Sequence, residues 1–102
     1  MNRAENTKDK LRDAANALAT GEGDIKDRLR NALIYHFSYV ERQYLGTQLQ
    51  PIYDRVISQS RKKPRFKGDS IVEAALYRMR KKTAARIATD VWEIFRSVYR
   101  VY

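Results

Sequence analysis

The chain has 102 residues, a length that fits one domain with a real but modest hydrophobic core. It has no cysteine and one histidine, which excludes disulfides, thiolate metal sites, a thiol nucleophile and a structural zinc site. No apolar run approaches the roughly 20 residues of a membrane span, and the polar N-terminal residues do not form a signal peptide. We therefore expect a cytoplasmic protein.

The residue types favour an all-α fold. Helix-forming residues dominate, and the alternating Val/Thr-rich segments that a sheet needs are missing. The share of hydrophobic residues, 43%, is that of a folded chain and not of a disordered one. We expect a compact bundle of four or five helices in a single domain, residues 1–102, with a frayed N-terminus over about residues 1–6.

Two helices are predicted on either side of a glycine-containing turn. Thr7 is a suitable N-cap for the first helix, and Gly21 is a stop signal for it. Asp24 is a suitable N-cap for the second helix, which we expect to run from about Ile25 to Tyr44. The short connection predicts that the two helices are antiparallel neighbours.

The second helix has a clear core face, and a third helix follows it. Residues at helical spacing form that face, namely Ile25, Leu29, Ala32, Leu33, His36, Tyr39, Val40 and Tyr44. We place Ile34 and Phe37 on the opposite side, which another helix or a second subunit would have to cover. Thr47 and Gln50 have the spacing of a capping box for the third helix, and Pro51 suits its first turn.

Residues 61–86 hold most of the charge imbalance of the chain. The formal net charge is +9, and this quarter of the sequence has ten basic residues against two acidic ones, a net charge of +8. Residues 61–69 are too charged, and too interrupted by Pro64 and Gly68, to be the interior of a helix. We expect them to form a long exposed loop, and the asymmetry indicates a polyanionic partner.

The C-terminal segment predicts the helix around which the bundle is organised. Asp69 or Ser70 caps a fourth helix, which we expect to break from the fifth near Lys82 and Thr83. An apolar arc of roughly 200° covers the fifth helix. It contains Ala84, Ile87, Ala88, Val91, Trp92, Ile94, Phe95, Val98, Tyr99, Val101 and Tyr102. This wide face places helices two and five at the centre of the bundle and favours a homodimer.

Two segments resemble parts of small bacterial all-helical proteins of uncharacterised function. They are Ala19 to Ile25 and Arg78 to Ala88, about a fifth of the chain. The resemblance implies no activity and no site residue.

Basic residues interleaved with aromatic ones predict a nucleic-acid interface. Lys and Arg on a loop and on the free face of the next helix can neutralise phosphates, and Phe66 and Tyr77 can stack on unpaired bases. The candidate residues are Arg61, Lys62, Lys63, Arg65, Phe66, Lys67, Tyr77, Arg78, Lys81, Lys82 and Arg86. We expect a small non-catalytic protein that binds DNA or RNA, or a regulatory protein, with no metal and no cofactor.

Two other interpretations of the basic segment remain open. A protein interaction module, such as an inhibitor or adaptor, would dock the same residues on an acidic protein. A solvated basic face that serves only solubility, as in many small basic proteins, is the second interpretation.

A ribonuclease is the remaining alternative. Arg30-Asn31-Ala32-Leu33-Ile34-Tyr35-His36 is similar to the Arg, polar residue, four-residue spacer and His pattern of the HEPN ribonucleases, which are dimeric helical bundles. The resemblance implies that Arg30 and His36 lie at an RNA cleavage site. Six helical steps turn about 240°, so the two side chains diverge unless the helix is interrupted. A lone histidine on an apolar face is more often a hydrogen-bonded core residue.

The acidic pair on the fifth helix has a simpler explanation than a metal or acid–base site. Arg86 lies four positions from Asp90, and Arg96 and Arg100 lie three and seven positions from Glu93. This spacing predicts a ladder of surface ion pairs along the helix.

Overall fold

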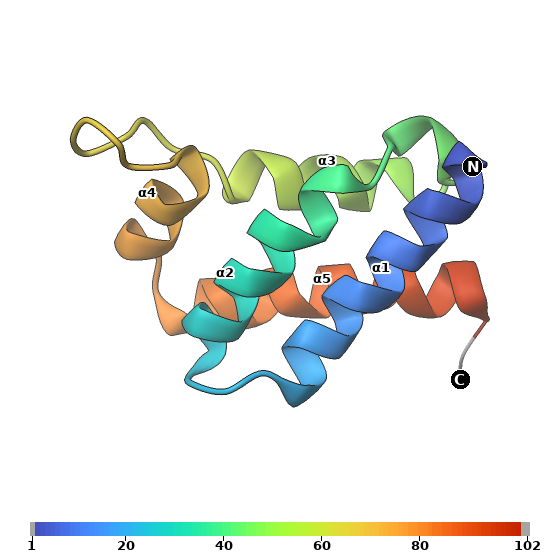
Figure 1. Ribbon diagram of the computed structural model, residues 1–102, viewed down its shortest axis with the longest axis horizontal. Coiled ribbons are helices and arrows are strands. Elements are labelled where there is room, and N and C mark those ends of the chain that lie inside the picture. The colour runs from blue at the N-terminus through green and yellow to red at the C-terminus, as the bar shows by residue number, and fades with distance from the viewer. Residues whose placement is uncertain (1, 101–102) are drawn as a thin grey trace.

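Helix α5 (Lys81–Tyr99) runs along the long axis of the molecule, and three of the other four helices pack against it (Figure 1). The computed structural model describes residues 2–100, so Val101 and Tyr102 of the predicted apolar arc lie outside the described residues. The other elements are α1 (Arg3–Thr20), α2 (Ile25–Tyr35), the 3-10 turns η1 (Phe37–Tyr39) and η2 (Arg42–Tyr44), α3 (Gln50–Gln59) and α4 (Ile71–Arg78). Residues 2–100 contain five α-helices and no strand, which confirms the predicted all-α bundle.

The core lies where α5 meets the first three helices. Helix α5 packs against α1, α2 and α3, and α2 packs against α1, α4 and α5, as expected of two central helices. The fully buried side chains of α5 meet those of the other helices in one cluster. Its members include Leu11, Leu29, Phe37, Val56, Ala84, Ile87, Val91 and Ile94. Burial of these apolar side chains stabilises the fold.

Helix α1 begins earlier than the sequence indicated. The side chain of Asn2 accepts a hydrogen bond from the Ala4 amide at 2.9 Å and caps the helix, so the prediction that Thr7 is the cap is wrong. Thr7 lies inside the helix and is buried, and its hydroxyl accepts a hydrogen bond from the Glu41 amide at 3.1 Å. Both residue types are good N-caps, but Thr7 lies one helical turn before the buried Leu11, on the face of α1 that packs on the core. The predicted cap Asp24 and stop Gly21 are confirmed.

Helix α2 ends nine residues before the predicted boundary. The backbone leaves the helical region at His36, and two 3-10 turns follow where the helix was expected to continue. The prediction that Phe37 lies opposite the core face is wrong. Phe37 follows Leu33 by one helical turn and is fully buried. Its ring stacks on that of Tyr53, with the ring centroids 5.4 Å apart. Ending the helix lets the chain turn and bury Val40 as well.

Helix α3 starts without the predicted capping box. Leu49 is its N-cap residue and makes no side-chain cap bond, so Thr47 does not cap it. The Gln50 side chain instead donates to the Leu45 carbonyl oxygen at 3.2 Å. Pro51 lies in the first turn, as predicted.

The break between α4 and α5 lies at Met79 and Arg80, both extended, and not at Lys82 and Thr83. Thr83 lies in the first turn of α5 and is not a cap. Starting the helix at Lys81 brings Ala84 into the core one turn later, and this packing outweighs the local capping preference of Thr83.

One apolar groove lies beside α5. Trp92 is 41% exposed and lines an apolar groove of about 320 Å³ with Leu18, Ile25 and Ala88. The homodimer stays a prediction, because one chain alone does not show what covers this groove. Within residues 2–100, every helix is too short or too polar to cross a membrane.

Candidate nucleic-acid interface

The predicted basic residues gather at one end of the molecule, which we call the basic end. It consists of residues 61–86, that is, the loop 61–69, α4, the break at Met79 and Arg80 and the first residues of α5, and it lies away from the N-terminus of α1 (Figure 1). The Lys62 amide donates to the Ile71 carbonyl oxygen at 3.0 Å, so the two ends of the loop lie side by side. The predicted cap Ser70 is confirmed, because its hydroxyl accepts from the Glu73 amide at 2.9 Å and starts α4 there.

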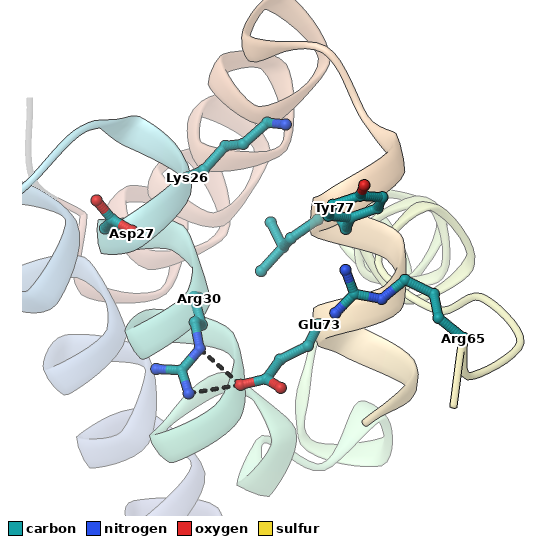
Figure 2. A pocket seen from close by; sticks show the side chains of 7 residues that line it. Lys26, Asp27, Arg30, Arg65, Glu73 and Tyr77 are labelled. Atoms are coloured by element: carbon teal, nitrogen blue, oxygen red, sulfur yellow. Dashed lines mark hydrogen bonds and ion pairs between the residues drawn. The ribbon is translucent and has the colours of Figure 1, made fainter. Parts of the chain in front are cut away.

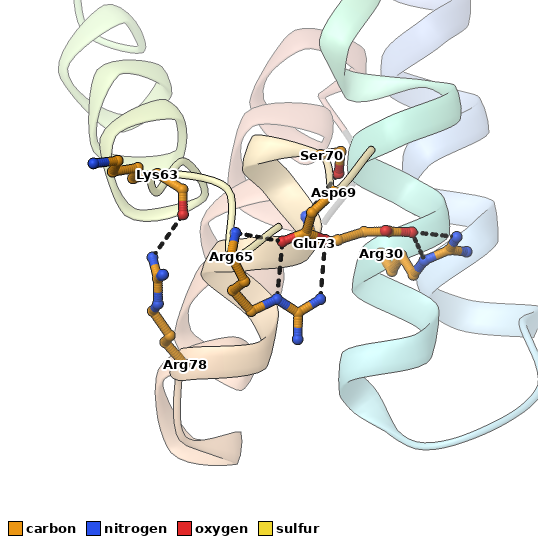
Figure 3. Close-up of polar contacts among 7 residues, drawn as sticks. All are labelled: Arg30, Lys63, Arg65, Asp69, Ser70, Glu73 and Arg78. Atoms are coloured by element: carbon orange, nitrogen blue, oxygen red, sulfur yellow. Dashed lines mark hydrogen bonds and ion pairs between the residues drawn. The ribbon is translucent and has the colours of Figure 1, made fainter. Parts of the chain in front are cut away.

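The loop is folded around a buried carboxylate. The Asp69 side chain is fully buried and accepts hydrogen bonds from Arg65 Nε at 2.8 Å, Arg65 Nη2 at 2.9 Å and the Arg65 amide at 3.1 Å (Figure 3). Gly68 has a φ of +93°, a conformation that side chains rarely adopt and that closes the turn. Hydrogen bonds from the Arg65 guanidinium and then from its amide hold the pKa of Asp69 at about 2.

The two predicted aromatic residues are exposed and share a cation. Phe66 is 62% exposed and Tyr77 is 70% exposed. The Arg65 guanidinium carbon lies 4.2 Å from the centre of the Tyr77 ring and 5.3 Å from that of Phe66. Arg65 therefore links loop and helix and has its charge compensated by Asp69, while both rings present surface to solvent.

Two more predicted residues have partners within the molecule. Arg78 Nη1 donates to the Lys63 carbonyl oxygen at 2.9 Å, which fixes the loop to α4 without neutralising the charge of Arg78 (Figure 3). Lys81 Nζ lies 3.6 Å from the carboxylate of Asp24, the N-cap residue of α2. Lys81 is 73% exposed at its side chain, so this ion pair is weak.

Most cations of the basic end have no carboxylate partner. They are exposed, and within residues 2–100 none of them forms an ion pair. These residues are Arg61, Lys62, Lys63, Lys67, Arg78, Arg80, Lys82 and Arg86. Such a set gives the basic end a positive potential that extends into solvent.

Arg80 is the residue that sequence reasoning missed. It is absent from the predicted site residues, and the predicted break at Lys82 and Thr83 placed it inside the fourth helix, whereas it lies at the break itself and lines a hollow of about 310 Å³. The hollow lies where α3, the loop, α4 and α5 meet, and Lys62, Arg78 and Thr83 line it as well. The one sequence signal for this role of Arg80 is that a basic residue lies close to an expected helix break.

A larger hollow of about 460 Å³ lies between α2 and α4 and carries charges of both signs (Figure 2). Arg30 Nε donates to Glu73 Oε1 at 2.7 Å, and this bond raises the pKa of Arg30. Lys26, Asp27 and Tyr77 line the same hollow. The paired charges here do not extend the positive surface.

The HEPN-like motif is divided between two environments. The Arg30 guanidinium is bound by Glu73 on α4. His36 lies at the C-terminal end of α2, where its Nδ1 atom is buried and has no hydrogen-bond partner within the described residues. Arg30 and His36 share no hydrogen bond, so within one chain the geometry gives no support to a joint cleavage site.

The acidic residues of α5 form ion pairs, but only one of them does so along the helix. Glu93 accepts from Arg96 Nη2 at 2.8 Å, as predicted. Asp90 does not pair with Arg86; its largely buried carboxylate binds Arg55 of α3 at 2.8 and 2.9 Å. The described residues contain no group of three or more acidic or histidine side chains that could hold a metal ion.

No protein-family model, curated protein or solved structure matches this chain. The function must therefore be inferred from the geometry of the chain itself.

Proposed function

We propose that this protein binds nucleic acid, without catalysis, through its basic end. The observation that carries the proposal is the set of eight exposed cations without ion pairs, gathered at one end of the molecule from residues 61–86. Binding to a polyanion releases condensed counterions from the phosphates, and this release drives association at low salt.

Single strands suit this surface better than duplexes. The exposed rings of Phe66 and Tyr77 lie among the cations, and base–aromatic stacking needs unpaired bases. Arg65 lies over the Tyr77 ring and leaves the rest of the ring exposed for a base. The firmly folded loop also lowers the entropy lost on binding, since Asp69 already fixes it.

The test is the salt dependence of binding after loop charges are removed. Lys62, Lys63 and Lys67 are exposed and make no side-chain hydrogen bond to the described residues, so replacing all three by Gln should leave the fold intact. We expect the slope of log K against log salt for a single strand to become shallower by about two, because each contact contributes about 0.7. Fluorescence anisotropy over a salt series measures the slope.

The matched control removes the same charge elsewhere. Lys8, Lys10 and Arg12 lie on α1, outside the basic end, and their replacement by Gln should change the slope by less than half as much. Equal effects of the two triple variants would mean that net charge alone attracts the strand. Absence of any binding at low salt would reject the proposal and favour an acidic protein as the partner of the basic end.

A further inference from the structure

A hollow at the junction of α3, α4 and α5 is lined by cations of the basic end. Lys62, Arg78 and Arg80 line it, and the other lining residues are Gln59, Ala75, Met79 and Thr83. The lining therefore contains three cations and no carboxylate, whereas the larger hollow beside α2 contains both signs. A small anion in this hollow would meet positive charge from three separate segments.

Local structure prepares these side chains for an anion. The bond from Arg78 Nη1 to the Lys63 carbonyl oxygen orients the guanidinium and leaves its other N–H groups available (Figure 3). Arg80 and Lys62 make no side-chain hydrogen bond to the described residues. Thr83 adds a hydroxyl donor.

We infer that this hollow binds a phosphate monoester at the end of a nucleic-acid strand. A monoester carries a charge of about −1.5 to −2 at pH 7 and has three free oxygens. An internal phosphodiester carries one charge and continues into the chain on both sides. Three cations that line one hollow between helices suit the group with the higher charge that enters end-on. The inference rests on the proposed nucleic-acid binding and assigns one part of that surface to strand ends.

The experiment compares strands that differ only at their ends. A short single strand of one sequence is prepared with a 5′-phosphate, with a 3′-phosphate and with hydroxyl groups at both ends, and fluorescence anisotropy gives the three affinities. We expect one phosphorylated form to bind about tenfold more tightly than the hydroxyl form, the effect of one or two charge-assisted hydrogen bonds. The preferred end identifies the strand polarity. Equal affinities for all three forms would overturn the inference and leave the proposed function standing.

Two matched variants distinguish binding of the phosphate in the hollow from general electrostatic attraction to the basic end. Arg80→Gln removes one charge inside the hollow, and Lys67→Gln removes one charge from the loop outside it. Arg80→Gln should reduce the preference for the phosphorylated strand to nearly one, whereas Lys67→Gln should weaken all strands and keep the preference. A preference that survives in Arg80→Gln and in Lys62→Gln would overturn the assignment to this hollow.

Inorganic phosphate tests the hollow without a strand. In ¹H–¹⁵N spectra of the wild type, added phosphate should shift the amide signals of Arg80 and Thr83, and Arg80→Gln should abolish these shifts. Shifts spread over the whole basic end would overturn the inference. A phosphorylated peptide that binds here when no strand does would reject nucleic acid as the source of the phosphate.

Discussion

Arginines are used differently in the first sixty residues and in residues 61–86. In the first region most of them bind a carboxylate; the paired residues are Arg3, Arg12, Arg30, Arg42 and Arg55, and all of these pairs except that of Arg12 join different segments of the chain. In the second region, only Arg65 and Lys81 have carboxylate partners among residues 2–100. Most arginine charge of the first region is thus compensated by carboxylates, while most positive charge of the second is left to solvent, which is why we assign the second to a partner.

The largest effect on stability is expected from a substitution in the buried core of the first region. Phe37→Ala removes a fully buried ring, and we expect the free energy of unfolding to fall by about 4 kcal/mol. Urea denaturation followed by circular dichroism measures the change. A loss below about 1 kcal/mol would contradict the described packing of Phe37 on Tyr53.

The matching change in the basic end should affect binding instead of stability. Phe66→Ala removes an exposed ring, so the free energy of unfolding should change by less than about 0.5 kcal/mol. Affinity for a single strand should fall about tenfold, because one base loses its stacking partner. An unchanged affinity in the anisotropy assay would exclude Phe66 from the interface.

Low pH should destabilise the fold, because protonation of Asp69 weakens its bonds to Arg65. Its pKa is about 2 in the fold against 3.8 as the ordinary value, so between these values the unfolded chain binds more protons and stability falls as the pH falls. The stabilisation from Asp69 is complete above about pH 4 and is lost as the pH falls through about 2. Asp69→Asn should remove this component, so its urea midpoint should depend less on pH over that range than that of the wild type. Identical pH profiles would mean that Arg65 does not hold Asp69.

The smallest effect is expected at an exposed pair of the first region. Arg42 binds Asp54 at 2.8 and 3.0 Å, but both side chains are about half exposed. Solvent screens such a pair, so Arg42→Ala should leave the urea midpoint within experimental error and strand affinity nearly unchanged. A clear loss of affinity would show that the strand contacts more than the basic end.

The fold class and some boundaries could be predicted because local chemistry determines them. Gly21, Asp24 and Ser70 end or begin helices as their residue types indicate. The end of α2 and the break at Arg80 could not be predicted. Both depend on which residues, far apart in the sequence, become buried together. The partner of Asp90 was missed for the same reason, because Arg55 reaches it from another helix.

The candidate site was partly predictable because its charges are close together in the sequence. The loop 61–69 and the start of α5 do lie at one end of the molecule. The roles within the site depend on tertiary structure: Asp69 compensates Arg65, and Arg80 joins Lys62 in the hollow only because three elements meet there. Composition indicates how much charge is present, and only the structure shows which charges lack partners.

The most direct test of the central claim is the affinity of the wild-type protein for a short single strand over a salt series, measured by fluorescence anisotropy. If the unpaired cations of the basic end contact phosphates, binding should be clear at low salt, and log K should fall linearly with log salt with a slope of about −3 or steeper. Absence of binding at low salt, or an affinity that does not change with salt, would contradict the account.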